Sequence, residues 1–179
     1  MSDYWHFCAM NDRGRPVMRD GTLVEIGKRY EIDGEIELCE RGYHGSLRAL
    51  DALSYAPGPW VSKRPLEGVI ADDDKVVGRA FVQQPGIDAT EILAKFARLC
   101  ALDVIHLWNA PGVVTRYIKT GDENIRAAAR DAAGDAVRDA AWDAVRDAAR
   151  GAARAAAWER QNCRLTRMLN TALREAAHE

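Results

Sequence analysis

The chain has 179 residues and a formal net charge of −2 at pH 7, with 27 acidic and 25 basic side chains. This balance gives no global reason to expect nucleic-acid or membrane binding, because proteins of both kinds usually carry a basic patch. The sequence has no run of about 20 apolar residues, and its start, MSDYWHFCAM, lacks the basic-then-apolar order of a signal peptide. We therefore expect a cytoplasmic protein with no membrane partner.

Residues 1–86 predict a β-rich module. Short runs of strand-forming residues alternate with turn residues, among them the Asp33-Gly34 pair, which suits a tight hairpin turn. The runs are YWHFCAM, TLVEIG, KRYEI, EIELCE, PWVSKRPLEGVI and KVVGRAFVQ. One helix is expected to interrupt them, because Ser46 is placed to cap the segment LRALDALSY, whose leucines recur every three residues.

Residues 87–120 predict a helical layer that packs on this module. Asp88 and Glu91 have the spacing of a capping box, and they precede an amphipathic segment that includes Phe96. Pro111 suits the first turn of a second helix. The fold class predicted for the whole chain is therefore α+β.

Residues 121–179 predict a long Ala-rich helical tail. Thr120 and Glu123 have the spacing of a capping box, and a four-residue unit then repeats as RDAA, GDAV, RDAA, WDAV, RDAA, RGAA and RAAA. Ala has the highest helix propensity but almost no side chain to bury, so such a helix depends on ion pairs and on close contact with another surface. The last apolar residues, among them Leu165 and Leu169, fit either a fold back onto the protein or a dimer seam.

Large side chains in the tail are the expected partner-binding residues. Trp142 and Trp158 are the aromatic residues of the Ala-rich segment, and tryptophan is common at binding hot spots. We place them with Val145 on a contact face for a host protein, a host protein complex or a second copy of this chain. Aspartates offset the arginines of the same segment, so we do not expect it to bind nucleic acid.

The N-terminal module resembles the ADP-ribosyltransferase fold, as seen in the poly-ADP-ribose polymerases. The matching elements are Trp5-His6 on the first strand, Gly42-Tyr43 on a later strand, an Ala-x-x-Tyr helix pattern at Ala52 to Tyr55, and Leu66-Glu67-Gly68 in the strand after it. The resemblance covers residues 4–70. It implies a cofactor, NAD, which we do not expect under the partner-binding interpretation.

The same resemblance assigns tentative roles to individual residues. It implies that His6 holds the ribose next to nicotinamide and that Tyr43 stacks on nicotinamide, with Tyr55 also near the cofactor. A carboxylate that supports the developing oxocarbenium charge is needed for NAD cleavage. Glu67 and Glu91 are candidates by position, with Glu67 taken as the catalytic one. The alternative is that His6 and Tyr43 are half-buried strand residues without a catalytic role.

Longer motifs resemble a family of uncharacterised phage and bacterial proteins. They are GEIELCERGYHGSLRALDALSYAPG, DDDKVVGRAF and FARLCALDVIHLWNAPGVVTRYIKTGDENIRAAAR, followed by the Ala-rich tail. This resemblance implies a phage or mobile-element context and an accessory role by binding, of the kind that anti-CRISPR and other counter-defence proteins have. Binding through the tail is thus the first hypothesis, and an ADP-ribosyltransferase-like enzyme is the alternative.

We expect no bound metal. A zinc site built from His6, Cys8, Cys39 and His44 lacks the close Cys-x-x-Cys spacing of structural zinc sites. The acidic run at 72–74 lies between two predicted strands and is typical of a solvated turn rather than a magnesium site.

Overall fold

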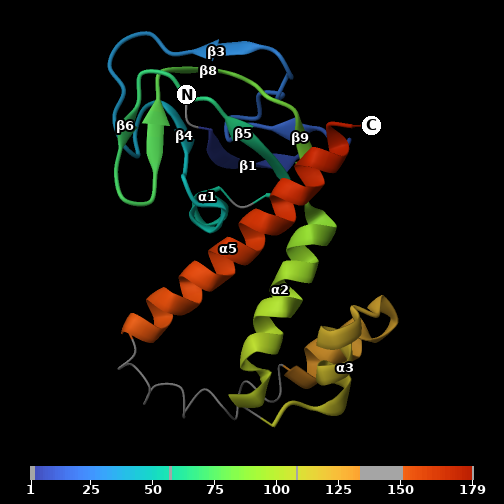
Figure 1. Ribbon diagram of the computed structural model, residues 1–179. Helices are drawn as coiled ribbons and strands as arrows, with labels where there is room; N and C mark the ends of the chain where they lie inside the picture. Colours follow the sequence, from blue (N-terminus) through green and yellow to red (C-terminus); the bar gives the residue numbers. More distant parts are fainter. Residues whose placement is uncertain (1–2, 57, 108, 134–150, 179) are drawn as a thin grey trace. The chain divides into compact units, whose positions relative to one another are not determined.

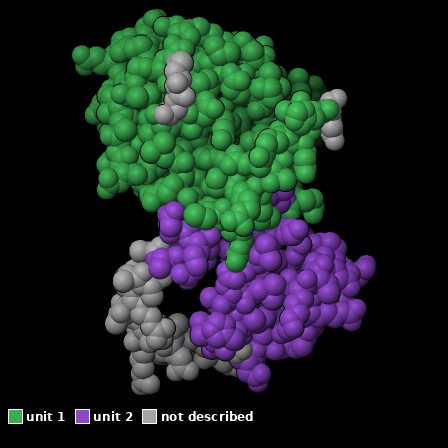
Figure 2. Space-filling model, in the orientation of Figure 1, with its two compact units in different colours: residues 1–91, 162–179 green, residues 92–161 purple. Residues whose placement is uncertain are grey.

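The structure, a computed structural model, describes residues 3–56, 58–107, 109–133 and 151–178. The chain divides into two compact units, coloured separately in Figure 2. Unit 1 consists of residues 1–91 and 162–179, and unit 2 consists of residues 92–161. These limits differ from the expected boundaries at residues 86 and 120, and the three-part division stays a prediction.

Unit 1 contains short antiparallel strands, the short helix α1 at their edge, and the C-terminal part of the last helix (Figure 1). The strands form three groups with the orders β2-β1-β5-β9, β3-β8 and β4-β7-β6. The elements are β1 (Tyr4–Met10), β2 (Pro16–Val17), β3 (Arg29–Glu31), β4 (Tyr43–Gly45), α1 (Ala49–Tyr55), β5 (Trp60–Arg64), β6 (Ile70–Ala71), β7 (Val76–Gly78), β8 (Ala80–Val82) and β9 (Gly86–Asp88).

Two predicted strands are wrong. The run TLVEIG forms only an isolated bridge at Leu23, because the hydroxyl of Tyr30 accepts a hydrogen bond from the Glu25 N–H at 3.0 Å and donates one to the Leu23 carbonyl at 3.2 Å. The run EIELCE turns back on itself, and the N–H of Arg41 donates to the Glu37 carbonyl at 2.9 Å. Side-chain and turn hydrogen bonds thus replace the strand ladder in both places.

The pairing of β1 with β5 sets which residues share a face. His6 lies opposite Ser62, and Tyr4 lies opposite Arg64. Directly opposite residues of an antiparallel pair point to the same face, and successive residues alternate between faces. One face of this ladder therefore carries His6 and Arg64, and the other carries Trp5 and Phe7.

The end of the chain folds back onto the N-terminal module within unit 1. The helix α5 (Gly151–Ala176) enters unit 1 at Asn162, whose side-chain oxygen accepts a hydrogen bond from the Leu50 N–H of α1 at 3.1 Å. Leu165 and Leu169 are fully buried. Of the two arrangements that the sequence allowed for this segment, the fold back onto the protein is the one observed.

The predicted cap of α1 is wrong. The helix begins at Ala49, after Arg48, with no side-chain cap hydrogen bond. Ser46 instead forms a β-bridge with Trp5, in which each N–H donates to the carbonyl of the other residue, at 2.8 and 3.0 Å. The bridge with Trp5 holds Ser46 in place, and the side chain of Asn162 instead accepts a hydrogen bond from one N–H of the first helical turn, that of Leu50.

Unit 2 is helical in its described part. It holds most of α2 (Thr90–Val104), the 3-10 turns η1 (Ile105–Leu107) and η2 (Glu123–Ile125), α3 (Gly112–Thr120), a helical segment at 126–133 and the beginning of α5. As predicted, α3 follows Pro111.

The predicted capping box at Thr120 and Glu123 is wrong. Thr120 is the last residue of α3, and Gly121, with a φ of 68°, ends that helix in the left-handed conformation that glycine favours. Asp122 then caps η2 by accepting a hydrogen bond from the Asn124 N–H at 3.1 Å. One helix ends and the next begins within three residues, so the cap falls at Asp122, two residues later than expected.

The α+β class predicted from the sequence is confirmed. None of the helices in the described ranges is both long enough and apolar enough to cross a membrane.

Candidate functional site

A cavity of about 890 Å³ opens inside unit 1, and His6 and Arg64 are among the residues that line it. Strands β1, β4 and β5 contribute to its wall, together with α1 and the loop that leads into β4. The side chains relevant to ligand binding are His6, Cys8, Arg19, Tyr43, His44, Tyr55, Arg64 and Lys75. The volume lies in the range of small-molecule and cofactor sites.

Three residues that the sequence singled out separately line this one cavity. His6 comes from β1, Tyr43 from β4 and Tyr55 from the end of α1. The pairing of β4 with β7, in which Tyr43 lies opposite Gly78, and the bridge between Trp5 and Ser46 bring the elements together. The cofactor-binding residues implied by the resemblance are therefore neighbours in space.

Arg64 is the most deeply buried charged residue of the cavity wall, with 2% of its surface exposed. Its guanidinium carbon lies 4.5 Å from the centre of the Phe81 ring, and its Nη2 donates to the sulfur of Cys8 at 3.8 Å. Its Nε has no hydrogen-bond partner in the described structure. Within that part of the chain, no carboxylate forms an ion pair with Arg64.

The charge of Arg64 is therefore unfavourable in the cavity as it stands. Burial lowers the pKa of its guanidinium to about 10, and the surrounding Cys8, Tyr30 and Tyr43 act weakly in the opposite direction. Buried charges in proteins are normally paired. At neutral pH Arg64 is a buried cation that lacks its counter-charge.

Two histidines of the wall are held in the neutral form. Burial is the largest cause that lowers the pKa of His6 well below its ordinary value, and the positive charge of Arg64 adds to it. Burial also lowers the pKa of His44, with further contributions from Lys75, Arg19 and Arg64. A neutral imidazole has one N–H donor and one acceptor nitrogen, so each ring is suited to hydroxyl groups.

Tyr43 lies at the junction of the cavity and the hydrophobic core. Its ring packs edge-on against Phe81, with centroids 4.9 Å apart, and edge-on against Tyr30 at 6.3 Å. Burial raises the pKa of its hydroxyl, so Tyr43 is neutral at pH 7. The packing fixes the orientation of one aromatic face of the wall.

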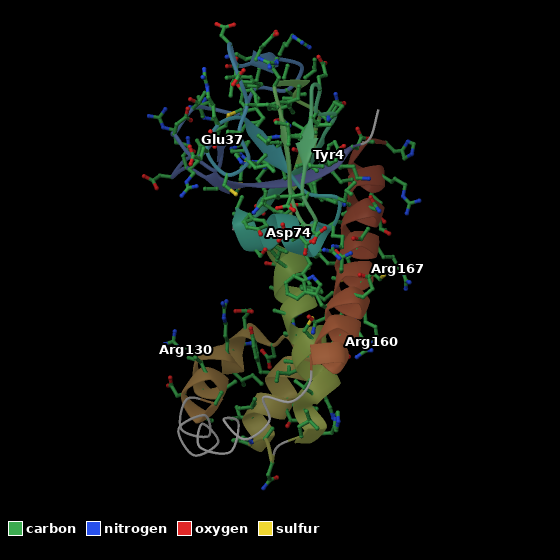
Figure 3. The ribbon with its side chains drawn as sticks, turned by 90° about the vertical axis from the view of Figure 1, so that its left-hand side faces the viewer. Tyr4, Glu37, Asp74, Arg130, Arg160 and Arg167 are labelled. Atoms are coloured by element: carbon green, nitrogen blue, oxygen red, sulfur yellow. The ribbon has the colours of Figure 1, made fainter. Side chains whose placement is uncertain are left out.

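Tyr55 lies at the outer edge of the cavity, with 52% of its surface exposed. Its hydroxyl donates to Asp74, labelled in Figure 3, at 2.5 Å, and the Nζ of Lys75 lies 5.2 Å from the centre of its ring. A hydrogen bond with Cys39 raises the pKa of Lys75. These contacts hold an aromatic ring and a cation at the entrance.

The candidate catalytic carboxylates lie elsewhere. Glu67 is outside the cavity wall and accepts two hydrogen bonds from Arg29, at 2.9 and 2.8 Å, which lower the pKa of its carboxyl group. Glu91 lies in the first turn of α2 and is also outside the wall. The carboxylates that line the cavity are Asp20 and Glu40. The structure thus does not bring Glu67 together with His6 and Tyr43.

Two of the three predicted partner-binding residues, Trp142 and Val145, lie outside the described residues. The third, Trp158, belongs to α5 in unit 2 and has 38% of its surface exposed. In the described ranges, no group of three or more His, Cys, Asp or Glu side chains is placed to hold a metal ion.

Sequence reasoning missed Arg64 and Lys75. The strand WVSKR gave no signal for Arg64, because Trp60, Ser62 and Arg64 on one face and Val61 and Lys63 on the other both mix apolar with polar side chains. Such a pattern does not show which face is buried. The position of Lys75 beside Tyr55 depends on a contact between distant segments, which no local pattern reveals.

Comparisons with protein-family models, curated proteins and solved structures found no match.

Proposed function

We propose that unit 1 is an NAD-binding module that uses its cavity in the manner of the ADP-ribosyltransferases. The observation that carries the proposal is the placement of His6, Tyr43 and Tyr55 on the wall of one cavity. These residues come from three separate elements and match the positions that bind NAD in that fold. A cavity of about 890 Å³ offers space for a ligand of this class.

Each of the three side chains has a physical role in this proposal. Tyr43 is neutral and fixed by Phe81, so its ring is suited to stack on nicotinamide. His6 is neutral, so it pairs with a ribose hydroxyl without an opposing charge. Tyr55 closes the outer side, where its hydroxyl is already bound to Asp74.

NAD cleavage would require a carboxylate close to the nicotinamide ribose, because positive charge develops there. Glu67 is bound to Arg29 outside the cavity wall, which leaves Asp20 and Glu40 as the carboxylates of the wall. Binding is therefore the proposed function, and nicotinamide release is the activity to measure beside it.

The test is a calorimetric titration with NAD, accompanied by an assay for nicotinamide release from labelled NAD. The variant His6→Ala/Tyr43→Ala removes two residues of the wall. The matched control, His106→Ala/Tyr117→Ala, removes the same residue types from unit 2, outside the cavity. We expect saturable NAD binding by the wild type and by the control, with loss in the cavity variant. Absence of NAD binding by the wild type, or equal binding by the cavity variant, would refute the proposal.

A second proposal follows from the tail. Trp158 keeps 38% of its surface exposed, which favours macromolecular binding through α5. We infer that this chain is a phage or mobile-element protein that binds a host protein, or a second copy of itself, in the bacterial cytoplasm. Deletion after Thr120 is not a clean test, because it also removes Leu165 and Leu169 from the core of unit 1.

Point substitutions avoid this problem. We expect Trp142→Ala/Trp158→Ala to lower self-association in sedimentation velocity, or to abolish recovery of a defined host protein in affinity capture, without changing the far-ultraviolet circular dichroism. Trp108→Ala provides a control outside the Ala-rich segment. Unchanged association and capture would refute the role of this face.

A further inference from the structure

We propose that Arg64 is the anchor for a phosphate or pyrophosphate group of the ligand that occupies the cavity. The proposal rests on the proposed use of this cavity as a ligand site, and it names the chemical class of the ligand. Arg64 was not among the residues that the sequence suggested, so the proposal rests on the structure alone.

The first step concerns the unmet bonding capacity of the guanidinium. Arg64 is 2% exposed, and its Nε has no hydrogen-bond partner within the described residues. The one side-chain hydrogen bond described for it runs to the sulfur of Cys8, a weak acceptor, at 3.8 Å. A guanidinium presents five N–H donors in a rigid fork that matches phosphate oxygens. Arg64 is thus a buried guanidinium whose Nε has no acceptor among the described residues and whose Nη2 has only the weak acceptor of Cys8.

The second step concerns orientation. The guanidinium carbon lies 4.5 Å from the centre of the Phe81 ring, and Phe81 is fully buried. Phe81 in turn stacks on Tyr30 at 5.2 Å, so the surface that supports the guanidinium is itself fixed. An arginine held in one orientation loses little conformational freedom when an anion binds.

The third step concerns charge. The cavity wall carries four permanently or normally cationic side chains, at Arg19, Arg41, Arg64 and Lys75, and two carboxylates, at Asp20 and Glu40. This local excess of positive charge occurs in a chain whose net charge is −2. A ligand with more than one negative charge is therefore favoured over a neutral one, and pyrophosphate meets that condition.

The neighbours of Arg64 connect this anchor with the other residues of the wall. His6 and Tyr43 are both close enough to interact electrostatically with the guanidinium. An aromatic stacking residue, a neutral imidazole and an arginine fork thus surround one space. A dinucleotide presents groups that match all three, namely a ring, a ribose hydroxyl and a pyrophosphate.

The experiment measures the melting temperature of the full chain against the concentration of inorganic pyrophosphate at constant ionic strength. The variants are Arg64→Met, Arg64→Lys and the control Arg116→Met. Arg116 has 68% of its side chain exposed, lies in unit 2 and carries the same single charge. A parallel calorimetric titration with NAD uses the same four proteins.

We expect saturable stabilisation of the wild type and of Arg116→Met by pyrophosphate. Arg64→Met should melt at the same temperature as the wild type or higher without ligand, because it removes an unpaired buried charge, and should show no response to pyrophosphate. Arg64→Lys keeps the charge but loses the fork, so it should need about 10-fold more pyrophosphate. NAD affinity should fall about 10- to 100-fold in Arg64→Met, as for the loss of charge-assisted hydrogen bonds.

The two proposals fail in different ways. Pyrophosphate stabilisation that depends on Arg64, with no NAD binding, would support the anion anchor and refute NAD as the ligand. NAD binding of equal affinity in the wild type and Arg64→Met would refute the anchor and leave the NAD proposal in place. No pyrophosphate response in the wild type, or the same response in Arg64→Met, would also overturn the anchor.

Discussion

The two faces of the β1–β5 ladder differ in what their residues contribute. One face carries Phe7 and Val61, both fully buried, which remove apolar surface from water and so favour folding. The other face carries His6, Ser62 and Arg64, which are polar side chains at equally regular positions of the same two strands. The ladder is the same on both sides, but the second face buries the polar side chains of Ser62 and Arg64 beside the apolar Trp60.

The polar face makes folding less favourable. Arg64 is 2% exposed, and the lowering of its pKa from its ordinary value to about 10 corresponds to a destabilisation on the order of 3 kcal/mol at neutral pH. A well-packed apolar side chain would avoid this cost. Residues that destabilise the empty protein while lining a cavity are those expected to act on a ligand.

The largest expected difference between the two faces is in the free energy of unfolding that is lost when apolar packing is removed. Phe7→Ala should lower the free energy of unfolding by about 3–5 kcal/mol, because Phe7 is fully buried and its removal leaves a void. His6→Ala, one residue earlier on the opposite face, should change it by less than about 1 kcal/mol. Urea denaturation followed by tryptophan fluorescence measures both. Equal losses in the two variants would erase the distinction between the faces.

The polar face also predicts sensitivity to acid. The folded-state pKa values of His6 and His44 lie below 6.5. As the pH falls below 6.5, the unfolded chain therefore binds more protons at these two histidines than the folded chain does. The free energy of unfolding should then fall by up to about 1.4 kcal/mol per pH unit for each histidine. Urea denaturation at pH 7.5, 6.5 and 5.5 checks the slope.

His6→Gln serves as the control for this pH dependence. It removes one titrating group from the wall, so the loss of stability between pH 6.5 and 5.5 should be smaller than in the wild type. A wild-type stability that does not change across this range, or the same slope in His6→Gln, would contradict the assignment of a depressed pKa to His6.

A smaller effect tests the contact between the tail and α1. Asn162→Ala should destabilise the protein by about 1–2 kcal/mol, because it leaves the buried N–H of Leu50 without its acceptor. Asn162→Asp retains an acceptor oxygen and should lose less. Asn170→Ala, two turns later on the same helix and only half-buried, should fall within about 0.5 kcal/mol of the wild type. Similar losses at positions 162 and 170 would show that the hydrogen bond contributes nothing specific.

Local patterns in the sequence predicted which segments are helical better than they predicted the strands or the helix caps. The class, the helix at 49–55 and the start of α3 after Pro111 followed from short-range signals. The runs TLVEIG and EIELCE failed as strands because the side chain of Tyr30 and the turn at Arg41, four to seven residues away along the chain, supply hydrogen bonds to them. Propensity measures what a segment prefers alone, and these contacts override it.

The site was predicted only in part, because short motifs identify residue types but not the contacts between distant segments. His6, Tyr43 and Tyr55 were chosen from short motifs, and all three line the cavity. Glu67 was chosen from a motif as well, but its partner Arg29 lies 38 residues earlier in the chain, and the ion pair holds it on the outer surface. Arg64 could not be recognised, because burial without a counter-charge is a property of the assembled wall.

The hydrogen bond between Leu50 and Asn162 joins residues 112 positions apart. The ribosome makes the chain from its N-terminus, so the strands that carry the cavity emerge well before the helix that completes their unit. Until Leu165 and Leu169 have been synthesised, the apolar surface that they cover stays open to water or to chaperones. Maturation of the cavity-bearing unit therefore waits until the helical turns that carry Leu165 and Leu169 have left the exit tunnel.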